Sequence, residues 1–389
     1  MRRSLVPVVL GLMVPAAVAA QNSVYGLMGI GFPGEPLSAR ARSLGGGIGA
    51  FDPTSALNPA TAVGLGWTSS GRARLVVGGV AGTALRSFTA GDSTVTGLRE
   101  TRFPFGIFGG TIPNTRFSFA GSFSTYAERT YDVTITGTQV LRGETVEVTD
   151  RIASDGAITD FRGAIAFRPG PGVFVGAAFH LLGGSSRLTV ARTFSNPAYA
   201  PYAERSQLVF SGTGVSAGVV LLPTSAIELA ASARLDGNLK TTSATRRAGT
   251  VGLPLSLSGG LRLTPAAGIS LSSTAVRHSW STAQPDLAAP TRAFDTWDIG
   301  GGVELSRPQA RGLAPPIRLG MRYRQLPFSN VATQPTETVL SGGTGVSLAG
   351  GLANLDLAVE RFRRSGGGAT EQGWHFSLGM VMTPAGFGR

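Results

Sequence analysis

The sequence of 389 residues contains no cysteine, a single lysine and three histidines. The lack of cysteine excludes disulfide bonds, a cysteine nucleophile and metal sites with thiolate ligands. Charge is also scarce, because Asp, Glu, Lys and Arg make up only 14% of the residues, against roughly 25% in soluble domains. Since 42% of the residues are hydrophobic, a soluble protein of this composition would have to bury a very large apolar surface.

Long hydrophobic runs are missing as well. After the first 20 residues, no window offers the roughly 20 uncharged apolar residues that a membrane-spanning helix needs. The first 20 residues contain Arg2 and Arg3, a short apolar run over 5–14, and then small residues before Gln21. This arrangement is typical of a secretory signal peptide over residues 1–20. The chain is therefore predicted to be exported.

The positive charge of the chain comes almost entirely from arginine. The formal net charge is +12, and Lys240 is the one lysine. Such a balance would suit a nucleic-acid partner, but the arginines are scattered and the signal peptide directs the chain out of the cytoplasm. We therefore expect no nucleic-acid partner. Arginine in barrels commonly lines the interior or the membrane interface, where it pairs with carboxylates and phosphates.

Strict alternation is the dominant pattern in the rest of the chain. Near the C-terminus, apolar side chains occupy every second position and small or polar residues lie between them. A period of two predicts a strand with one apolar face. The other face is mostly Gly, Ala and Ser, which favours an apolar face toward lipid and a small face toward a barrel interior. The apolar series is Trp374, Phe376, Leu378, Met380 and Met382.

The same pattern recurs along the chain and predicts about 14 strands. Short turns alternate with longer polar connections, as in bacterial membrane barrels, which have an even number of strands. We therefore predict an all-β fold, a transmembrane antiparallel β-barrel with both termini on the periplasmic side. The predicted strand cores are 72–87, 100–112, 115–136, 144–168, 172–193, 206–222, 226–241, 248–264, 267–282, 293–306, 316–328, 336–349, 352–364 and 371–383.

The stretch 38–60 differs from everything that follows it. It is small, polar and rich in glycine, and it ends in an Asn-Pro turn signal. Because it precedes many strands without resembling one, it predicts an N-terminal hatch or plug; a tight periplasmic turn region is the alternative. The predicted division is a signal peptide (1–20), a hatch segment (21–66) and a barrel (67–389). The motif residues are Gly45, Gly46, Gly47, Asp52, Asn58, Pro59 and Ala60.

This motif resembles the N-terminal signature of FadL-type outer-membrane transporters of hydrophobic compounds, and equally that of the related PorV-type barrels. The FadL resemblance implies a hatch folded inside a barrel in the outer membrane of a Gram-negative-type (diderm) bacterium. It also implies passive uptake of hydrophobic small molecules such as long-chain fatty acids. The expected partners are membrane lipids, the hydrophobic ligand and, during biogenesis, the barrel assembly machinery. A PorV-like scaffold or shuttle for protein secretion and a general porin are the alternatives.

Several residues are candidates for the interior of the barrel. The aromatic ones lie on the predicted inward register, where they would line a ligand site or pack against the hatch. The arginines lie on one strand between strands that carry inward acidic residues, which predicts interior ion pairs. A sharper alternative is an arginine that anchors a ligand carboxylate. These candidates are Phe108, Tyr126, Phe174, Arg318, Arg322 and Arg324.

Two prolines interrupt otherwise strong strands. Pro104 and Pro254 cannot donate to a strand ladder. Each predicts either a lateral gate, where a kinked strand lets the wall open sideways, or a bulge near the barrel rim.

Residues for covalent chemistry are not evident. The histidines, His180, His278 and His375, are predicted on separate strands without Asp or Glu at ligand spacing, so we expect no metal site. A barrel hydrolase would need Ser, His and a carboxylate or amide that converge, and no motif for such a site is recognisable. We therefore expect no enzyme activity, no catalytic residues and no cofactor.

Overall fold

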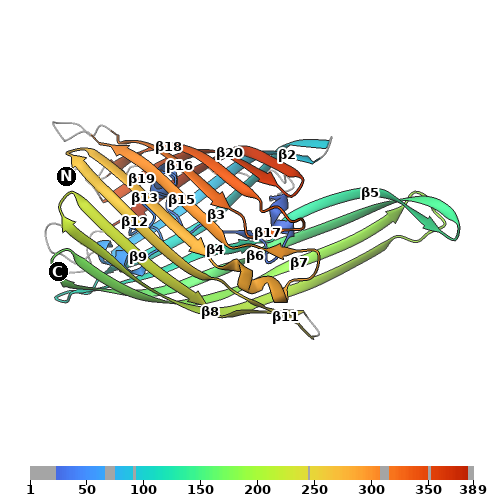
Figure 1. Cartoon of the computed structure of the whole chain (residues 1–389), viewed down its shortest axis with the longest axis horizontal. Coiled ribbons are helices and arrows are strands. Elements are labelled where there is room, and N and C mark those ends of the chain that lie inside the picture. The colour runs from blue at the N-terminus through green and yellow to red at the C-terminus, as the bar shows by residue number, and fades with distance from the viewer. Residues whose placement is uncertain are drawn as a thin grey trace, which may run out of the picture.

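The computed structural model describes residues 23–65, 75–90, 93–243, 246–306, 315–348 and 352–383. The predicted signal peptide lies outside these ranges. Fourteen of the described strands pair in antiparallel order and close into a ring, in which β20 meets β2 (Figure 1). The ring consists of β2 (Leu75–Ala90), β3 (Ser93–Thr111), β4 (Phe117–Glu128), β6 (Glu144–Gly170), β7 (Val173–Phe194), β8 (Tyr202–Thr224), β9 (Ile227–Asp236), β12 (Leu255–Ala266), β13 (Ile269–His278), β15 (Thr296–Leu305), β16 (Ile317–Gln325), β18 (Thr336–Leu348), β19 (Ala353–Gly366) and β20 (Ala369–Met382).

The alternation in the sequence explains the two faces of this wall. Strands in lipid satisfy their backbone N–H and C=O groups only by pairing around a complete ring. On β16, the side chains of Leu319 and Met321 point outward and are 56% and 60% exposed, whereas Arg322, the next residue, points inward and is buried. The predicted all-β barrel of 14 strands is confirmed. No helix within the described ranges is long and apolar enough to span a membrane.

Three strands of the ring continue well beyond it. β6, β7 and β8 have 27, 22 and 23 residues, and β5 (Tyr131–Leu141) pairs with β6, so that together they form an arm (Figure 1, right). The sequence predicted one strand over 115–136, but the structure divides it into β4 and β5. On the partner strand beside this break, Gly156 has φ +151°, a conformation that glycine adopts far more readily than other residues.

The end of the barrel that carries the arm is partly covered by folded connections. These are β10 (Asn238–Ser243), β11 (Arg246–Gly252), η3 (Trp280–Asp286), β14 (Arg292–Ala293) and β17 (Phe328–Ser329). Trp280 and Phe328 pack edge to face with ring centroids 5.2 Å apart. Both belong to a buried apolar cluster that also includes Leu239 and Leu253. The predicted strand over 226–241 is therefore also divided, into β9 and β10.

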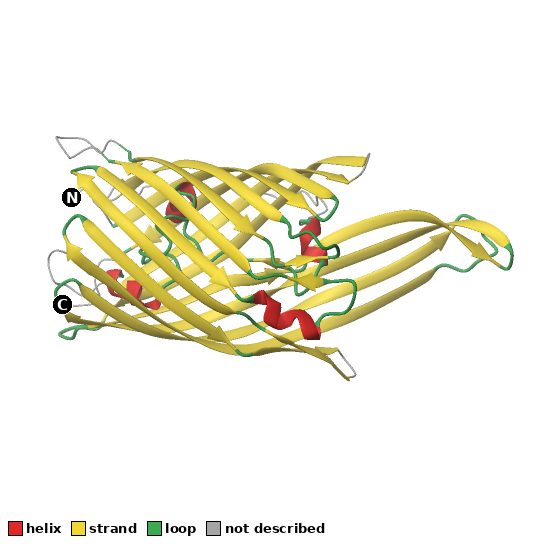
Figure 2. Ribbon diagram, viewed as in Figure 1, coloured by secondary structure: helices red, strands yellow, loops and turns green. Residues whose placement is uncertain are grey.

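The N-terminal segment 23–65 lies inside the barrel (Figure 2). It contains η1 (Val24–Leu27), β1 (Phe32–Pro33), α1 (Ala39–Ser43) and η2 (Pro59–Gly64). α1 contacts β18 and β19, whereas η2 contacts β6 and β7 on another part of the wall. The segment therefore crosses the interior between different sides of the ring.

Asp52 organises the turn between α1 and η2. Ser38 caps α1, and its Oγ accepts a hydrogen bond from the amide of Ala41 at 3.0 Å. The same hydroxyl donates to the carboxylate of Asp52, which also accepts hydrogen bonds from the hydroxyls of Ser55 and Thr54. Asp52 is 2% exposed, so these donors replace the water that a buried carboxylate loses.

Asn58 and Pro59 start η2 and attach it to the wall. The Asn58 Oδ1 accepts a hydrogen bond from the amide of Ala60 at 3.0 Å, as expected of an N-cap residue. Pro59 follows at the first helical position, where its missing N–H has no cost. The Asn58 side-chain amide donates to the carbonyl of Val219 on β8 at 3.3 Å. The neighbouring Gly218 leaves room for this contact, since a Cβ there would lie 2.1 Å from Asn58 Oδ1.

The glycine run of the segment seats against glycines of the wall. Gly45 has φ +60°, and a Cβ added to Gly300 on β15 would lie 1.9 Å from the Gly45 carbonyl oxygen. Real Cβ atoms do not approach backbone so closely, so an alanine at position 300 would displace one of the two chains. Close backbone contact of this kind is a standard reason for glycine in both partners.

We predict that Gly300→Ala loosens the segment from the wall while the barrel still forms. The matched control is Gly259→Ala, on an adjacent part of the same barrel, because a Cβ at position 259 meets nothing within 4 Å. Trypsin cleavage at Arg40 and Arg42 in detergent measures how firmly the segment is seated. Faster cleavage is expected for G300A than for G259A; equal rates would show that the seat tolerates the methyl group.

Candidate functional site

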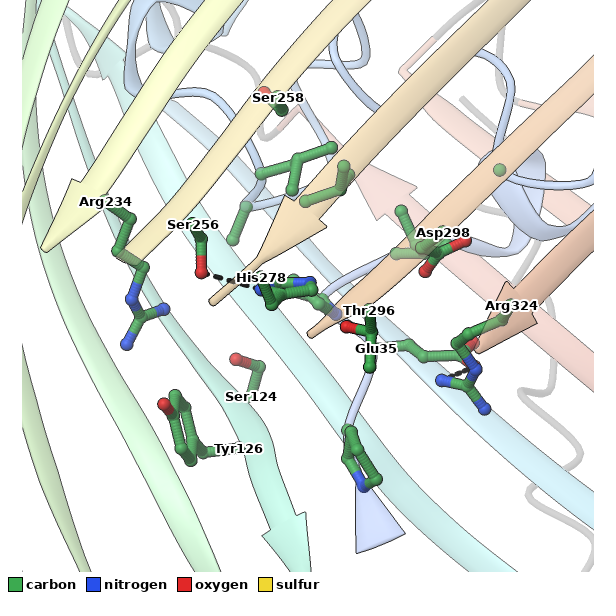
Figure 3. A pocket seen from close by; sticks show the side chains of 18 of the residues that line it. Glu35, Ser124, Tyr126, Arg234, Ser256, Ser258, His278, Thr296, Asp298 and Arg324 are labelled. Carbon is green, nitrogen blue, oxygen red and sulfur yellow. Dashed lines mark hydrogen bonds and ion pairs between the residues drawn. The ribbon is translucent and has the colours of Figure 1, made fainter. Parts of the chain in front are cut away.

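A pocket lies inside the barrel (Figure 3). Its empty volume is about 1240 Å³, which includes the open solvent where the pocket is not enclosed. The N-terminal segment forms one side of it, with Glu35, Leu37 and Leu57. The inward faces of β4, β6 to β9, β12, β13, β15 and β16 form the other sides, and Trp280 contributes from η3. The lining combines apolar groups with hydroxyls, guanidiniums and carboxylates, so the pocket is suited to a molecule with both characters.

One wall of the pocket is built around Arg234 on β9. Its guanidinium donates to Asp160 at 2.6 Å and to Asp236 at 2.9 Å. It also lies 5.2 Å from the ring centroid of Tyr126, within cation–π distance. The Tyr126 hydroxyl donates to Asp236 at 3.2 Å. These contacts fix the Tyr126 ring as a flat surface of the pocket.

A hydrogen-bonded row of three side chains lies next to this wall. His180 on β7 has its Nδ1 3.0 Å from both carboxylate oxygens of Asp160 on β6. Its Nε2 lies 2.9 Å from the Oγ of Ser216 on β8. The three residues come from adjacent strands and share the inward face, which is why they meet although the sequence separates them widely.

Glu35 of the N-terminal segment closes the opposite side. Its carboxylate lies 2.8 Å from Arg42, 3.0 Å from Arg322 and 2.7 Å from Arg324. Burial alone would raise the pKa of this carboxyl, but the three guanidiniums hold the pKa well below its usual range. The carboxylate is therefore ionised at neutral pH and ties the segment to β16.

The predicted interior arginines fall into two groups. Arg322 and Arg324 line the pocket, together with the predicted Tyr126. Arg318 lies outside it and pairs with Glu304 and Asp356, each at 2.6 Å. The predicted interior ion-pair network is thus present. Phe174 points inward but packs against the buried apolar clusters that include residues of the segment, which corresponds to the hatch-packing alternative.

The prediction that Phe108 faces the interior is wrong. Phe108 lies on the outer face of β3 and is 52% exposed. The reason is a bulge: β3 pairs with β2 as Arg102 with Gly82 and Phe105 with Val80, so an extra residue is inserted between these pairs. An extra residue inverts the inward and outward positions of everything that follows.

Pro104 sits inside this bulge and beside a gap in the strand pairing of the wall, across which Arg102 of β3 forms an ion pair with Glu128 of β4. The ladder between β3 and β4 begins at the pair of Phe105 with Ser124 and runs only toward the turn at 112–116. Past this pair, β4 is joined instead by β1, where Phe32 pairs with Glu128 and Pro33 with Ala127. In the described part of the chain, the β4-facing edge of residues 93–104 of β3 therefore carries no strand. A second pocket borders on Pro104 and shares Glu35 with the first.

Pro254 marks a different kind of break. It lies between β11 and β12, opposite Gly237 between β9 and β10, and the two ladders resume on either side of this point. The amide of Leu253 still donates to the carbonyl of Gly237 at 3.4 Å. Counted with period two from the outward-facing Leu255 and Leu257, Leu253 would face lipid, but it turns inward and is 6% exposed. The strand is bent here without a gap.

Sequence reasoning missed three residues that shape the pocket. Asp160 and Arg234 lie on the inward register of their strands, so the alternation that identified the arginines of β16 would have found them. Glu35 lies in the N-terminal segment, which has no periodic pattern, so nothing in the sequence indicates which way its side chain points. Within the described ranges, no cluster of three or more potential metal-binding residues is present.

The fold and the interior define a class of protein. A closed antiparallel barrel with an apolar outer belt, long connections at one end and short turns at the other is the architecture of bacterial outer-membrane proteins. A folded N-terminal segment inside it distinguishes this barrel from an open porin. No family model matches the sequence, and no curated protein matches it.

Solved structures of such barrels share this fold. The Ralstonia pickettii toluene transporter TbuX has 16% sequence identity and a TM-score of 0.61, over 90% of this chain and 98% of that one. The Pseudomonas putida toluene transporter TodX has 12% identity and a TM-score of 0.59, over 90% and 98%. A Pseudomonas aeruginosa FadL homologue has 13% identity and a TM-score of 0.58, over 90% and 99%. The predicted resemblance to FadL-type barrels is confirmed at the level of the fold.

Proposed function

We propose that this protein is an outer-membrane channel through which small hydrophobic molecules diffuse down their gradient. The observation that carries this proposal is the pocket inside the barrel, enclosed between the N-terminal segment and the wall. The names of the structural neighbours, toluene transporters and a FadL homologue, support a hydrophobic ligand. No covalent step is needed for such passage.

The route we propose leads from the pocket to the gap beside Pro104. The two pockets share Pro33, Gly34, Glu35 and Thr125, so they adjoin at these residues. A hydrophobic molecule that leaves through the gap would enter lipid without crossing the aqueous space below. In this proposal Pro104 belongs to the opening, whereas Pro254 lies at a closed bend.

We further propose that the segment 23–65 acts as a hatch. Its α1 and η2 contact different sides of the ring, which obstructs a straight path through the barrel. An ion would therefore find no open pore. A general porin predicts the reverse, since its interior is a water-filled channel.

The proposal predicts selective uptake without high conductance. Vesicles with a lipopolysaccharide outer leaflet, with and without the protein, are to be exposed to labelled toluene, a labelled long-chain fatty acid and a sugar. We expect faster entry of at least one hydrophobic probe and unchanged entry of the sugar, with little single-channel conductance in planar bilayers. Whether long-chain fatty acids are among the molecules that pass is a separate hypothesis. The entry rate of the labelled fatty acid tests it.

A protein-secretion scaffold is the second candidate. The arm formed by β5 to β8 favours it, because it extends the barrel into a surface that transport of small molecules does not require. Uptake of no hydrophobic probe would reject the channel and favour the scaffold. Rapid entry of the sugar together with the hydrophobic probes would instead identify a general porin.

A further inference from the structure

We infer that the pocket selects small ring compounds that carry a neutral oxygen group, such as a phenol, over the corresponding hydrocarbons. This inference rests on the proposed function and names the ligand class of its pocket. It starts from polar groups in the wall that no protein partner satisfies.

Ser124 on β4 and Thr296 at the start of β15 are the first of these groups. Both side chains line the pocket, and they are 4% and 3% exposed. Neither hydroxyl has a hydrogen-bond partner within the described ranges, in contrast to Ser256, which bonds to His278 at 2.7 Å. Figure 3 shows both of them directed toward the interior of the pocket. Buried polar groups are normally paired, so these hydroxyls are available to a bound molecule.

Arg234 also lines the pocket and keeps one nitrogen without a hydrogen-bond partner within the described residues. Two of its nitrogens bond to Asp160 and Asp236, but its Nη2 has no hydrogen-bond partner in the described part of the chain. A guanidinium N–H can only donate, so the group that meets it must accept. The Nη2 atom is itself buried, so it can donate to the oxygen of a phenol or a carbonyl only if the guanidinium turns toward the pocket. The hydroxyls of Ser124 and Thr296 can donate to that oxygen or accept from a phenol hydroxyl directly.

The remainder of the lining suits a ring. The contacts of Tyr126 fix the orientation of its ring. Apolar surface is added by Trp280, Leu37, Leu57 and Val276. A hydrocarbon of the same size would fill this space but would strip water from the free hydroxyls of Ser124 and Thr296 without replacing it. A site that contains such polar groups discriminates against the analogue that lacks the matching oxygen.

The charges of the pocket exclude an anion as the preferred ligand. Among the lining residues, the carboxylates of Glu35, Asp160, Asp236 and Asp298 outnumber the guanidiniums of Arg234, Arg322 and Arg324. Each of these guanidiniums already contacts at least one carboxylate. A ligand carboxylate would therefore add a charge that the pocket does not balance, whereas a neutral oxygen group adds none.

Three probes that share one ring and one methyl group test the inference: toluene, p-cresol and p-toluate. Binding is to be measured by calorimetry with the protein in lipid nanodiscs, and partition into empty nanodiscs is subtracted. We expect p-cresol to bind tighter than toluene by roughly tenfold or more, and p-toluate to bind more weakly than p-cresol. The double variant S124A/T296V should reduce the preference for p-cresol to within about threefold.

Ser118→Ala is the matched control. Ser118 lies on the same face of β4 as Ser124, its hydroxyl is buried and also unpartnered within the described residues, but it does not line the pocket. The preference should be unchanged in S118A. The inference is wrong if toluene binds as tightly as p-cresol, or if p-toluate binds most tightly of the three. Neither result contradicts the proposed channel. If none of the three binds, the inference is wrong, and the uptake assay with the fatty acid decides separately whether the protein is a channel.

Discussion

Replacing Glu35 by alanine is expected to release the N-terminal segment from the barrel wall. The carboxylate lies within 3.0 Å of Arg42, Arg322 and Arg324, and removing it leaves three guanidiniums close together around an empty space. Loss of one partner from a buried ion pair costs about 3 kcal/mol or more. Each arginine keeps one other carboxylate, Glu360 for Arg42, Asp298 for Arg322 and Glu337 for Arg324. None of these three carboxylates joins all three arginines as Glu35 does.

Trypsin cleavage of the segment in detergent reports this release. Arg40 and Arg42 lie in α1, and cleavage there should be slow in the native protein and fast in E35A. Asp132→Asn is the control, because Asp132 pairs with Arg151 on the arm, where both side chains are accessible to water, and such pairs contribute little. A native cleavage rate in E35A would show that the remaining contacts of the segment hold it without Glu35.

The pH dependence of this protection follows from the lowered pKa of Glu35, and it is to be measured with a protease that is active in acid, such as pepsin, in place of trypsin. A depressed pKa in the folded state means that the stabilisation is complete above the unfolded value of 4.5 and is lost as the pH falls through the lower, folded value. We expect the segment to stay protected across the neutral range. Protection should decrease only in acid below pH 4.5, and E35A should lack this acid transition.

The barrel itself could be predicted from the sequence because its rules are local. Alternation with period two follows from strand geometry, and a wall between lipid and a narrow interior makes that alternation strict. The apolar series that ends at Met382 occupies the outer face of β20 as expected. The arginines of β16 were found for the same reason, since their register follows from Leu319 and Met321.

The errors arose where one residue breaks the period. The bulge at Pro104 moved Phe108 from the interior to the lipid face, and the bend at Pro254 turned Leu253 inward. Proline was recognised in both strands, but its presence does not tell whether the register shifts by one or is kept. The pocket also depends on contacts between distant strands, such as His180 with Asp160 and Ser216, and single-sequence patterns do not specify which residues of neighbouring strands face one another.

A disulfide between positions 33 and 127 is expected to stop uptake reversibly. Pro33 of β1 and Ala127 of β4 are register partners, and such partners have Cα atoms about 4.5–5.5 Å apart, within the range that a disulfide bridges. The chain has no cysteine of its own, so the variant P33C/A127C can form only this intramolecular bond. Oxidation would hold β1 on the free edge of β4, beside the gap at Pro104.

The measurement is entry of the hydrophobic probe into vesicles before and after reduction. If molecules leave through the gap, β1 must move aside, so the oxidised variant should show the entry rate of empty vesicles and the reduced variant the native rate. The control V303C/L319C joins β15 to β16 at another register pair, away from the gap, and should transport in both states. Both variants contain one engineered disulfide, so they differ only in where that disulfide joins the strands. Unchanged entry in oxidised P33C/A127C would place the exit elsewhere in the barrel and leave β1 as a fixed part of its wall.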